Sequence, residues 1–449
     1  MKFYITFFIL FLTSYNVYSQ TYIKVNAPTT FLGVPGIGVE VPISNKMTFQ
    51  LDVTASFWNS VTTNKYDKRP YVFNQIFPEI RYHFSELNNG FYVGIHAGSG
   101  MFKLSKNSSY ASSNKYQYGY IIFTRVYKNY DEMLDYESNL EEEDRIDVIS
   151  IVTPNHLHFD PAIKSLDKGI PVIIDKPMTF DSDQAKKLCD KVEESGIPFA
   201  VTHTYTGYPM VKEARSIISE GKIGKIRKVA VEYPQGWLST MLEKGDNKQA
   251  SWRTDPSKSG KAGSMGDIGT HAANMVEYVT GKKIIKLFSK VNVFVDGRML
   301  EDDGNVLLSL EDNIEGSLMT SQIATGEEND LKVRVWGEIG GIEWKHSDPN
   351  TLILKFSNSP NQVLRAGVDN SYLSDFALAH CRTPSGHPEG FIEAFANIYR
   401  NFAYSVSNYR DNKKNDPIYD YPTVQDGYRG MKFIDAVIES SEKSKWINI

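Results

Sequence analysis

Apolar and polar residues alternate strictly along several stretches in the first quarter of the chain. The clearest stretches are residues 49–57, 80–84 and 91–97. Because successive side chains of a strand point to opposite faces of a sheet, a period of two predicts strands with one apolar face. About five or six such strands fit between residues 20 and 122 by this count. We therefore expect an all-β antiparallel segment there.

The pattern changes after residue 122. Residues 130–143 have the spacing of an exposed helix, and residues 146–152 form a nearly continuous apolar run that is typical of a buried parallel strand. Helix and strand patterns then alternate, with helices at 160–168 and 182–195 and strands at 172–174 and 199–202. Such alternation predicts an α/β arrangement, a parallel sheet with crossover helices, up to about residue 204.

Strand patterns dominate after residue 205. We expect strands at residues 226–232, 283–295, 306–310, 316–323, 331–336 and 351–356. Two helical patterns, at 390–406 and 423–441, close the chain. The combination predicts an α+β domain with a large, open, mostly antiparallel sheet over residues 205–449.

Residues 1–19 have the pattern of an export signal. Lys2 precedes an apolar run over residues 3–12, and Val17-Tyr18-Ser19 ends in a small residue. This pattern predicts a secretory signal peptide that is cut near Ser19 and Gln20, and therefore a protein exported to the periplasm or the outer membrane. A buried N-terminal strand or anchor is the alternative. The run is shorter than the roughly 20 apolar residues that a membrane-spanning helix needs, and no other stretch of the sequence is long and apolar enough.

Long alternating strands, frequent aromatic residues and an export signal together favour an outer-membrane-type β-barrel. A closed barrel needs at least about eight strands, so the strands expected here form a barrel-like fragment. A small soluble antiparallel sheet is the competing interpretation. Residues 20–120 resemble a family of small outer-membrane barrel-like proteins of unknown function, and this likeness implies association with a membrane through the N-terminal segment.

The composition narrows the class of partner. The chain has 449 residues, 41% of them hydrophobic, and a formal net charge of −5 at pH 7. Since no basic patch stands out, we expect no nucleic acid partner. The two cysteines, Cys189 and Cys381, lie far apart in the sequence, so we expect two unpaired thiols and no metal site.

Three groups of polar residues are candidates for chemistry. The first, Thr153-Pro154-Asn155-His156-Leu157-His158, follows the apolar run that ends at Val152. Ligands of open α/β sheets bind at the carboxyl ends of the strands, so this turn is suitably placed. A plain strand-to-helix turn with an asparagine cap is the alternative.

The second group is Asp175-Lys176-Pro177, which follows the next expected strand. A lysine in this position can act in acid–base chemistry or through its charge, because burial can lower a lysine pKa toward the working pH. The Lys176–Pro177 bond is a candidate for the cis form. The alternative is a surface lysine paired with Asp175.

The third group lies in the glycine-rich stretch 260–271, which leads into a helical pattern at 272–278. Asp267 and His271 are four positions apart, so both project from one helix face. A histidine titrates near neutral pH, as an acid–base group should, and Asp267 could orient it or the substrate. The alternative is that Asp267 caps the helix and that His271 is a core histidine with its hydrogen bonds satisfied.

The order of these groups resembles the Gfo/Idh/MocA (glucose–fructose oxidoreductase and inositol dehydrogenase) family. The motifs TPNxxH, then Asp or Glu with Lys-Pro, then a glycine-rich loop with DxGxH occur in this order between about residue 124 and the end of the chain. The likeness extends to Trp252-Arg253 and to residues 337–341, 387–390 and 422–427. Asp175 stands where the family more often has glutamate, which shortens the reach of the carboxylate.

The resemblance implies an oxidoreductase that moves a hydride between NAD or NADP and a hydroxyl-bearing carbon of a sugar or cyclitol. Residues 123–204 would be the C-terminal half of a Rossmann nucleotide-binding domain. Residues 205–449 would form the α/β domain that binds the substrate, and its open sheet would mediate homo-oligomers.

The resemblance also assigns roles to single residues. Lys176 would assist proton transfer, His271 would be the principal acid–base group, and Asp267 would position the substrate and the histidine. The residues expected to line the cofactor are Thr153, Asn155, His158 and Asp175, with Trp252 and Arg253 at its nicotinamide end.

The opening of a Rossmann domain is missing from the sequence. It consists of a strand, a GxGxxG turn and a helix, with an acidic residue about 20 positions further on. Gly36-Ile37-Gly38 and Gly98-Ser99-Gly100 lack the third glycine and lie in strand patterns. Without the pyrophosphate cradle we expect poor affinity for a free dinucleotide. Three hypotheses follow: an impaired or partner-completed oxidoreductase, an inactive or carbohydrate-binding fusion remnant, and an envelope β-barrel-like protein.

Overall fold

The computed structural model describes residues 22–25, 36–44, 46–64, 67–83, 92–103, 116–122, 125, 127–141 and 144–449. The chain divides into two compact units, Met1–Lys128 and Asn129–Ile449. The expected signal peptide, residues 1–19, lies outside the described residues.

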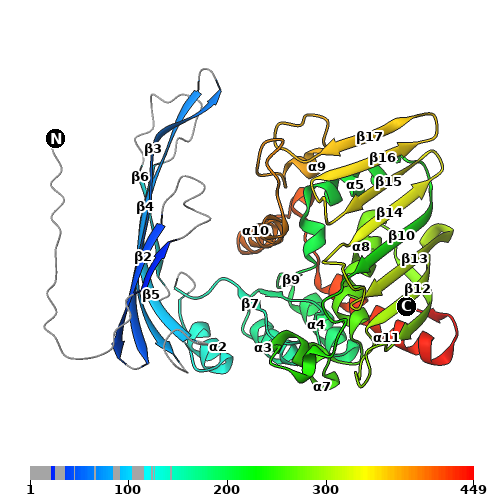
Figure 1. The fold of residues 1–449 in the computed structure, drawn as a ribbon, viewed down its shortest axis with the longest axis horizontal. Helices are drawn as coiled ribbons and strands as arrows, with labels where there is room; N and C mark the ends of the chain where they lie inside the picture. The colour runs from blue at the N-terminus through cyan, green and yellow to red at the C-terminus, as the bar shows by residue number, and fades with distance from the viewer. Residues whose placement is uncertain are drawn as a thin grey trace, which may run out of the picture. The chain divides into compact units, whose positions relative to one another are not determined.

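The first unit contains a six-stranded antiparallel sheet, drawn as blue to cyan arrows in Figure 1. Its strands are β1 (Tyr22–Val25), β2 (Gly36–Ser44), β3 (Met47–Asn64), β4 (Asp67–His83), β5 (Tyr92–Lys103) and β6 (Tyr116–Ile122). Each strand pairs with the next one along the chain, so the order in the sheet is β1-β2-β3-β4-β5-β6. The predicted antiparallel all-β segment is confirmed.

A short parallel sheet opens the second unit. Its elements, in chain order, are α2 (Tyr130–Ser138), β7 (Ile149–Ile151), α3 (Phe159–Asp167), β8 (Val172–Ile174), α4 (Ser182–Ser195) and β9 (Phe199–Val201). The strands lie in the order β7-β8-β9 and run parallel, with α3 and α4 as the crossovers. The predicted parallel sheet is confirmed, although β7 is shorter than the apolar run of residues 146–152 suggested.

Both faces of β8 and β9 are buried, whereas Ser150 of β7 is exposed. Val172 and Ile174 of β8 belong to the main core of the unit. Ile173, which points the other way, packs with Ile398 and Phe402 of α10 (Phe391–Arg410). Burial on both faces explains why β8 and β9 are apolar without alternation.

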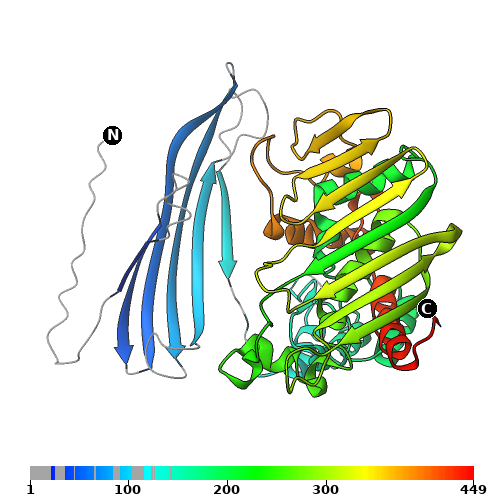
Figure 2. The ribbon, with the colours of Figure 1, turned by 45° about the vertical axis from the view of Figure 1, so that its right-hand side comes forward.

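A nine-stranded sheet dominates the rest of the second unit (Figure 2). Its strands are β10 (Ile226–Pro234), β11 (Ile284–Asn292), β12 (Asp303–Leu310), β13 (Ile314–Ser321), β14 (Lys332–Gly337), β15 (Gly340–Lys345), β16 (Thr351–Phe356), β17 (Ser359–Arg365) and β18 (Ile447–Asn448). Their order is β17-β16-β15-β14-β10-β13-β12-β11-β18, and every pair is antiparallel except β10 with β13. The predicted open, mostly antiparallel sheet is confirmed, and β15, β17 and β18 are additions to it.

Helices cover one face of this sheet. α5 (Pro209–Ser219) contacts β15 and β16, α8 (Thr270–Thr280) contacts β10, β13 and β14, and α11 (Val424–Lys443) contacts β11. Figures 1 and 2 both show these helices on one side of the sheet and no described helix on the other. The alternation along each strand is therefore apolar toward the helices and mostly polar toward the bare face.

Short elements complete the second unit. They are α6 (Lys248–Arg253), α7 (Pro256–Ser259) and α9 (Asp375–Leu378), 3-10 turns at Asn155–Leu157, Thr204–Gly207, Leu242–Lys244, Glu311–Asn313 and Pro417–Tyr419, and a π-helical turn at Met265–Gly269. Cys189 and Cys381 are both buried and unpaired. Among the residues that the structure describes, no helix combines the length and the apolar character that a membrane crossing requires.

Candidate active site

Lys176 leaves the carboxyl end of β8 and reaches the turn that carries Asp267. Only Asp175 separates Lys176 from the strand, and the Lys176–Pro177 bond is cis. The Lys176 ammonium donates hydrogen bonds of 2.6 Å both to Asp267 Oδ1 and to the Asp267 carbonyl oxygen. The alternative interpretation, in which Lys176 is a surface lysine paired with Asp175, is therefore wrong. The Lys176 side chain is only 14% exposed, and Asp175 accepts a hydrogen bond from the Thr202 hydroxyl instead.

Asp267 gathers two cations and an amide. Gln322 donates to its Oδ2 at 2.9 Å, and Arg253 Nε lies 3.5 Å from the same oxygen. Burial by itself would raise the pKa of this carboxyl. The charges of Lys176 and Arg253, with the hydrogen bonds from Lys176 and Gln322, outweigh burial and hold the pKa below its ordinary value. Asp267 is therefore an ionised anchor that fixes the direction of Lys176.

Glu301 fixes the glycine-rich stretch that leads into the turn with Asp267. Glu301 is buried, and its carboxylate accepts from the backbone N–H groups of Gly263 and Met265, each at 2.8 Å. A Cβ on Gly263 would lie 2.3 Å from the Glu301 carbonyl oxygen, so this close approach requires glycine. Burial raises the pKa of Glu301 to about 7. Asp267 is not the cap of α8, as the alternative had it, because Gly269 holds that position.

His271 lies in the first turn of α8 and is 9% exposed. Its Nδ1 has no hydrogen-bond partner in the described part of the chain, so it is not a satisfied core histidine. Its ring lies edge-on to the rings of Tyr205 and His203, with centroids 5.0 Å and 5.6 Å away. Burial, and then the charge of Lys176, lower the pKa of His271 well below its ordinary value. The imidazole is therefore neutral at about pH 7 and can accept a proton.

Lys176, Asp267 and His271 line one cavity with a volume of about 400 Å³. The other walls are mostly aromatic rings and amides, which suit a ligand that has both apolar faces and hydroxyl groups. These walls consist of Tyr205, Tyr233, Trp237, Phe391, Gln235, Gln249, Asn329, Arg253 and Ile268. The structure thus brings together the three residues that the sequence proposed as catalytic.

Asn329 forms hydrogen bonds with three other residues of the cavity wall. Its Oδ1 accepts from the Tyr233 hydroxyl at 2.7 Å and from Gln235 at 2.5 Å, and its amide donates to the Tyr205 hydroxyl at 3.1 Å. No motif in the sequence marked these residues. Tyr205 carries a usable signal, because it follows β9 as Lys176 follows β8, at the same edge of a parallel sheet. Asn329 has no local signal, since it lies in the loop before β14.

Two of the residues expected to line a cofactor are buried and already bonded. Asn155 donates to the Ser259 carbonyl at 2.9 Å. The two ring nitrogens of His158 lie 3.0 Å and 2.6 Å from the carbonyl oxygens of Pro177 and Thr153. Both side chains thereby fasten the turn after β7 to neighbouring loops, and this geometry favours a structural role for them.

The other expected cofactor residues are more accessible. Thr153 is exposed, and its hydroxyl donates to the Leu157 carbonyl at 3.3 Å. Asp175 accepts from the Lys176 backbone N–H at 3.1 Å. The Arg253 guanidinium lies 4.3 Å from the centroid of the Trp252 ring, and Arg253 reaches the cavity. Their part in cofactor binding stays a prediction.

The described residues fit one end of a dinucleotide. The cavity lies at the carboxyl end of β8, where open α/β sheets bind ligands, and Lys176 and Arg253 project into it. The pyrophosphate end needs the backbone N–H groups of a glycine-rich turn at a helix N-terminus. The turn after β7, residues 152–158, contains no glycine, and its Asn155 is turned toward Ser259. The nicotinamide end thus finds suitable groups, whereas the turn after β7 offers the phosphates no glycine-rich cradle.

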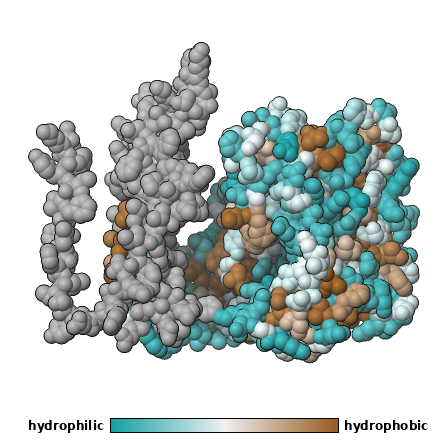
Figure 3. Space-filling model, viewed as in Figure 1, coloured by the Kyte–Doolittle hydropathy of each residue, from teal (hydrophilic) through white to brown (hydrophobic). Residues whose placement is uncertain are grey.

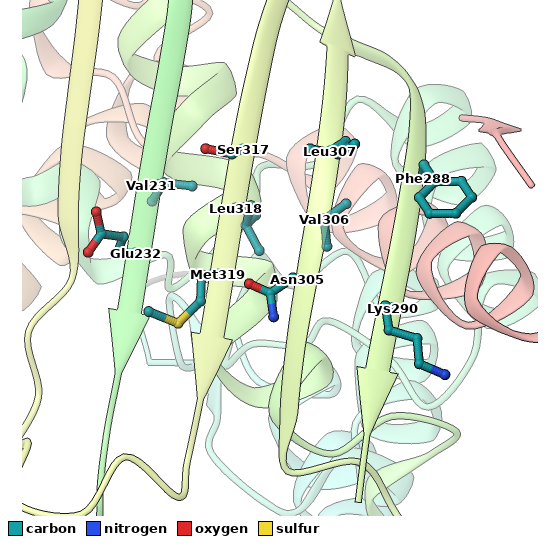
Figure 4. A pocket seen from close by; sticks show the side chains of 10 residues that line it. All are labelled: Val231, Glu232, Phe288, Lys290, Asn305, Val306, Leu307, Ser317, Leu318 and Met319. Carbon is teal, nitrogen blue, oxygen red and sulfur yellow. The ribbon is translucent and has the colours of Figure 1, made fainter. Parts of the chain in front are cut away.

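A second hollow lies on the bare face of the nine-stranded sheet (Figure 4). It has a volume of about 430 Å³ and crosses β10, β13, β12 and β11. Glu232 and Lys290 lie at two sides of it, with apolar side chains between them, among them Leu307, which is 53% exposed. It shares no residue with the cavity of Lys176 and has no group suited to acid–base chemistry at its centre.

Family models match three parts of the chain. Residues 109–203 match the oxidoreductase family with an NAD-binding Rossmann fold, and residues 211–343 match the GFO/IDH/MocA C-terminal domain. Residues 5–143 match a protein of unknown function, DUF3575. The first and third matches overlap, so the change from one kind of sequence to the other falls between residues 109 and 143.

Individual proteins match the region that follows. An uncharacterized oxidoreductase of Bacillus subtilis, YfiI, is 33% identical over 331 residues, which are 72% of this chain and 82% of the relative. The crystal structure of an oxidoreductase from Sinorhizobium meliloti is 41% identical with a TM-score of 0.63, and the match covers 72% of this chain and 84% of that one. An inositol dehydrogenase homologue from Azotobacter vinelandii, solved with NADH and myo-inositol, is 28% identical with a TM-score of 0.66 and coverages of 72% and 83%.

Proposed function

This chain belongs to the Gfo/Idh/MocA oxidoreductase family, and on that premise we propose that its second unit moves a hydride between NAD(P) and a hydroxyl-bearing carbon of a sugar or cyclitol. One observation carries the proposal. Lys176, Asp267 and His271 meet at one cavity although Lys176 and Asp267 are 91 positions apart in the chain. NAD(P) is the cofactor of the family's nucleotide domain, and when bound its nicotinamide ring accepts or gives the hydride.

The chain's own residues handle the proton. An ammonium group has three N–H donors, and two of those of Lys176 are held by Asp267. The third is left for a substrate oxygen in the cavity. His271 is neutral because its pKa is lowered, so it can take the proton of the substrate hydroxyl as a general base. An alcohol that loses this proton and a hydride becomes a carbonyl compound, which completes the oxidation.

The aromatic and amide walls suit the substrate class. Trp237 and Phe391 offer ring faces to the C–H faces of a sugar or cyclitol ring. Gln235 and Asn329 carry amide groups that can exchange hydrogen bonds with hydroxyl groups. The myo-inositol complex of the Azotobacter vinelandii homologue supports the same class of ligand.

A carbohydrate-binding protein without hydride transfer is the second candidate. The turn of residues 152–158, which has no glycine, favours it, because a dinucleotide held only at its nicotinamide end loses the contacts that normally anchor its phosphates. If this second candidate function is correct, the cavity binds the sugar, and the dinucleotide binds weakly or not at all.

Binding measurements on the full chain separate the two candidates. Calorimetric titrations with NADH, NADPH and myo-inositol would be run on the wild type, on Lys176→Ala and on a control, Lys222→Ala, whose ammonium pairs with Glu220 at the surface. Saturable NADH or NADPH binding that Lys176→Ala weakens about tenfold and Lys222→Ala leaves unchanged supports the oxidoreductase. Binding of the cyclitol without either dinucleotide supports the second candidate, and binding of none of the three ligands contradicts both.

We also propose that two copies associate through the bare face of the nine-stranded sheet. Exposed Leu307 with Phe288 supplies an apolar centre. Across a two-fold axis, Lys290 of one copy can approach Glu232 of the other copy, which within its own chain pairs with Arg334. Light scattering should give a dimer or a larger assembly for the wild type and a shift toward monomer for Leu307→Asp. A monomeric wild type would contradict this arrangement.

A further inference from the structure

The six-stranded sheet of the first unit exposes apolar side chains. Across β2, β3 and β4 the register aligns Val39 with Leu51 and Pro78, so these three point to the same face. Val53 and Ile80 follow two positions along their strands and point the same way. All five are exposed, between 38% and 46% for the four aliphatic ones. We call these five residues the apolar face.

The alternate residues point the other way and are polar. Glu40 and Gln50 are directly opposed in β2 and β3, and they are 0% and 5% exposed. Thr48, also buried, donates a hydrogen bond of 2.5 Å to Glu40 Oε1. Gln50 donates to the carboxylate of Asp52, two positions along β3. A sheet with one face in water does the reverse, because it buries its apolar face and leaves the polar one solvated.

We propose that the apolar face contacts the hydrocarbon of a membrane. Strands in a bilayer alternate apolar residues toward the lipid with polar residues toward the interior, which is the arrangement of these rows. In water the same arrangement has two costs. The buried Glu40 loses its hydration, and the exposed Leu51 stays in contact with water. Figure 3 agrees, since brown atoms gather on this sheet where its described residues are coloured.

The export pattern supports a lipid partner, and the strand edges add a requirement. The export pattern of residues 1–19 would take the chain to the cell envelope, where such a surface finds a bilayer. Open strand edges do not occur in hydrocarbon, and β1 and β6 each have one neighbour among the described strands. We therefore expect β1 and β6 to pair with a second copy of the chain in the membrane.

A scan of single cysteines tests the face directly. The full chain would carry one new cysteine at a time, Leu51→Cys or Val53→Cys on the apolar face and Thr48→Cys or Gln50→Cys on the opposite face. Each variant would be labelled with an environment-sensitive fluorophore and reconstituted into phosphatidylethanolamine–phosphatidylglycerol vesicles with brominated acyl chains. The wild type, whose two thiols are buried, serves as the unlabelled control. Quenching of the apolar-face labels at least about threefold stronger than that of the opposite face is expected. Equal quenching, or none, would overturn the proposal.

A matched pair of charge substitutions tests the affinity for the bilayer. Val53→Asp places a carboxylate on the apolar face, and Val363→Asp makes the same change on β17 of the second unit, where Val363 is also exposed. In vesicle flotation Val53→Asp should lower the bound fraction about tenfold or more, whereas Val363→Asp should leave it unchanged. Loss of binding in both variants, or in neither, contradicts the proposal. Association of the wild type into oligomers in water without vesicle binding would instead assign the face to another copy of the protein.

Chemical cross-linking of the reconstituted chain tests the edges. A dimer band that depends on vesicles agrees with pairing of β1 and β6 between copies. A chain that stays monomeric in the vesicles excludes it.

Discussion

The two large sheets of this protein follow the same period of two and turn opposite faces inward. In β10 of the nine-stranded sheet, Val231 is buried and its neighbour Glu232 faces outward. In β2 of the six-stranded sheet, Glu40 is buried and its neighbour Val39 is exposed. Alternation along a strand therefore shows that the two faces differ and leaves open which of them is inside.

The surroundings of each sheet decide between its faces. The nine-stranded sheet has α5, α8 and α11 on one side, and these helices present apolar side chains that the sheet can pack against. The described part of the first unit contains no helix, and on the buried side of its sheet Thr48 donates a hydrogen bond to Glu40. A membrane outside the sheet would take the place that the helices take in the second unit.

The largest expected effect comes from reversing a face of the nine-stranded sheet. Val231→Asp puts a carboxylate where the structure leaves only 1% exposure. We expect the second unit to lose about 4 kcal/mol or more of its free energy of unfolding, enough to unfold a marginal domain. Urea titration followed by tryptophan fluorescence measures it, and Glu232→Val, the next residue on the outer face, should change the free energy by less than about 1 kcal/mol. Similar values for the two variants would contradict the assignment of the faces.

Breaking the central ion pair of the cavity should cost somewhat less. Lys176→Met leaves the Asp267 carboxylate with Arg253 and Gln322 only, and the pKa of Asp267 should rise toward its ordinary value. We expect a loss of about 3 kcal/mol in the free energy of unfolding at neutral pH. Adding Asp267→Asn should recover part of this loss, because the unpaired charge is then gone. A double variant that is less stable than Lys176→Met would count against the pair as the source of the effect.

A smaller effect concerns the pH dependence of the second unit. Burial lowers the pKa of His203 from 6.5 to about 4, so the folded state favours the neutral ring. The contribution of His203 to stability is intact above pH 6.5 and is lost as the pH falls toward 4. Between about pH 7 and pH 5 this one group should cost about 2 kcal/mol. Thermal unfolding as a function of pH should show a shallower acid decline for His203→Gln than for the wild type, and parallel declines would rule His203 out as the cause.

The smallest effect lies at the start of α11. Thr423 caps this helix in a capping box, since its hydroxyl accepts from the Asp426 backbone N–H while the Asp426 carboxylate accepts from the Thr423 N–H at 2.7 Å. Thr423→Ala should lower the free energy of unfolding by about 1 kcal/mol, and Thr423→Ser should retain most of it. Urea titration of both variants distinguishes a lost cap from a general disturbance of the helix, which would affect the two alike.

Much of the fold could be predicted from local pattern. The apolar run of β8 and the helix α4 begin and end where the sequence placed them, and α4 has Asp181 as its cap and Gly196 after its last turn. β15 was missed because Gly340 and Gly341 lack the side chains that make a strand recognisable. β17 was missed because its residues are almost all exposed, so that no apolar face marks it.

The candidate site was predictable where chemistry follows a strand end or a glycine-rich turn. Lys176, Asp267 and His271 stand at such places. Gln322 and Asn329 do not, because Gln322 joins the site through its hydrogen bond to Asp267 and Asn329 through its hydrogen bond to Tyr205, and both partners are far away in the sequence. His203 was missed because only its contact with the ring of His271 relates it to the site, and the sequence does not show this contact.

The sequence by itself determined most of the elements, the order of the motifs and the resemblance to a family, because hydrophobic period, turn chemistry and residue spacing are local properties of a chain. Only the tertiary structure decided that Lys176 pairs with Asp267 rather than with Asp175, and which face of each sheet is buried. Both decisions depend on what lies opposite a side chain in space. The energies of burial and of charge depend on neighbours from distant parts of the chain and on the surrounding solvent. The residues adjacent in sequence do not specify these surroundings.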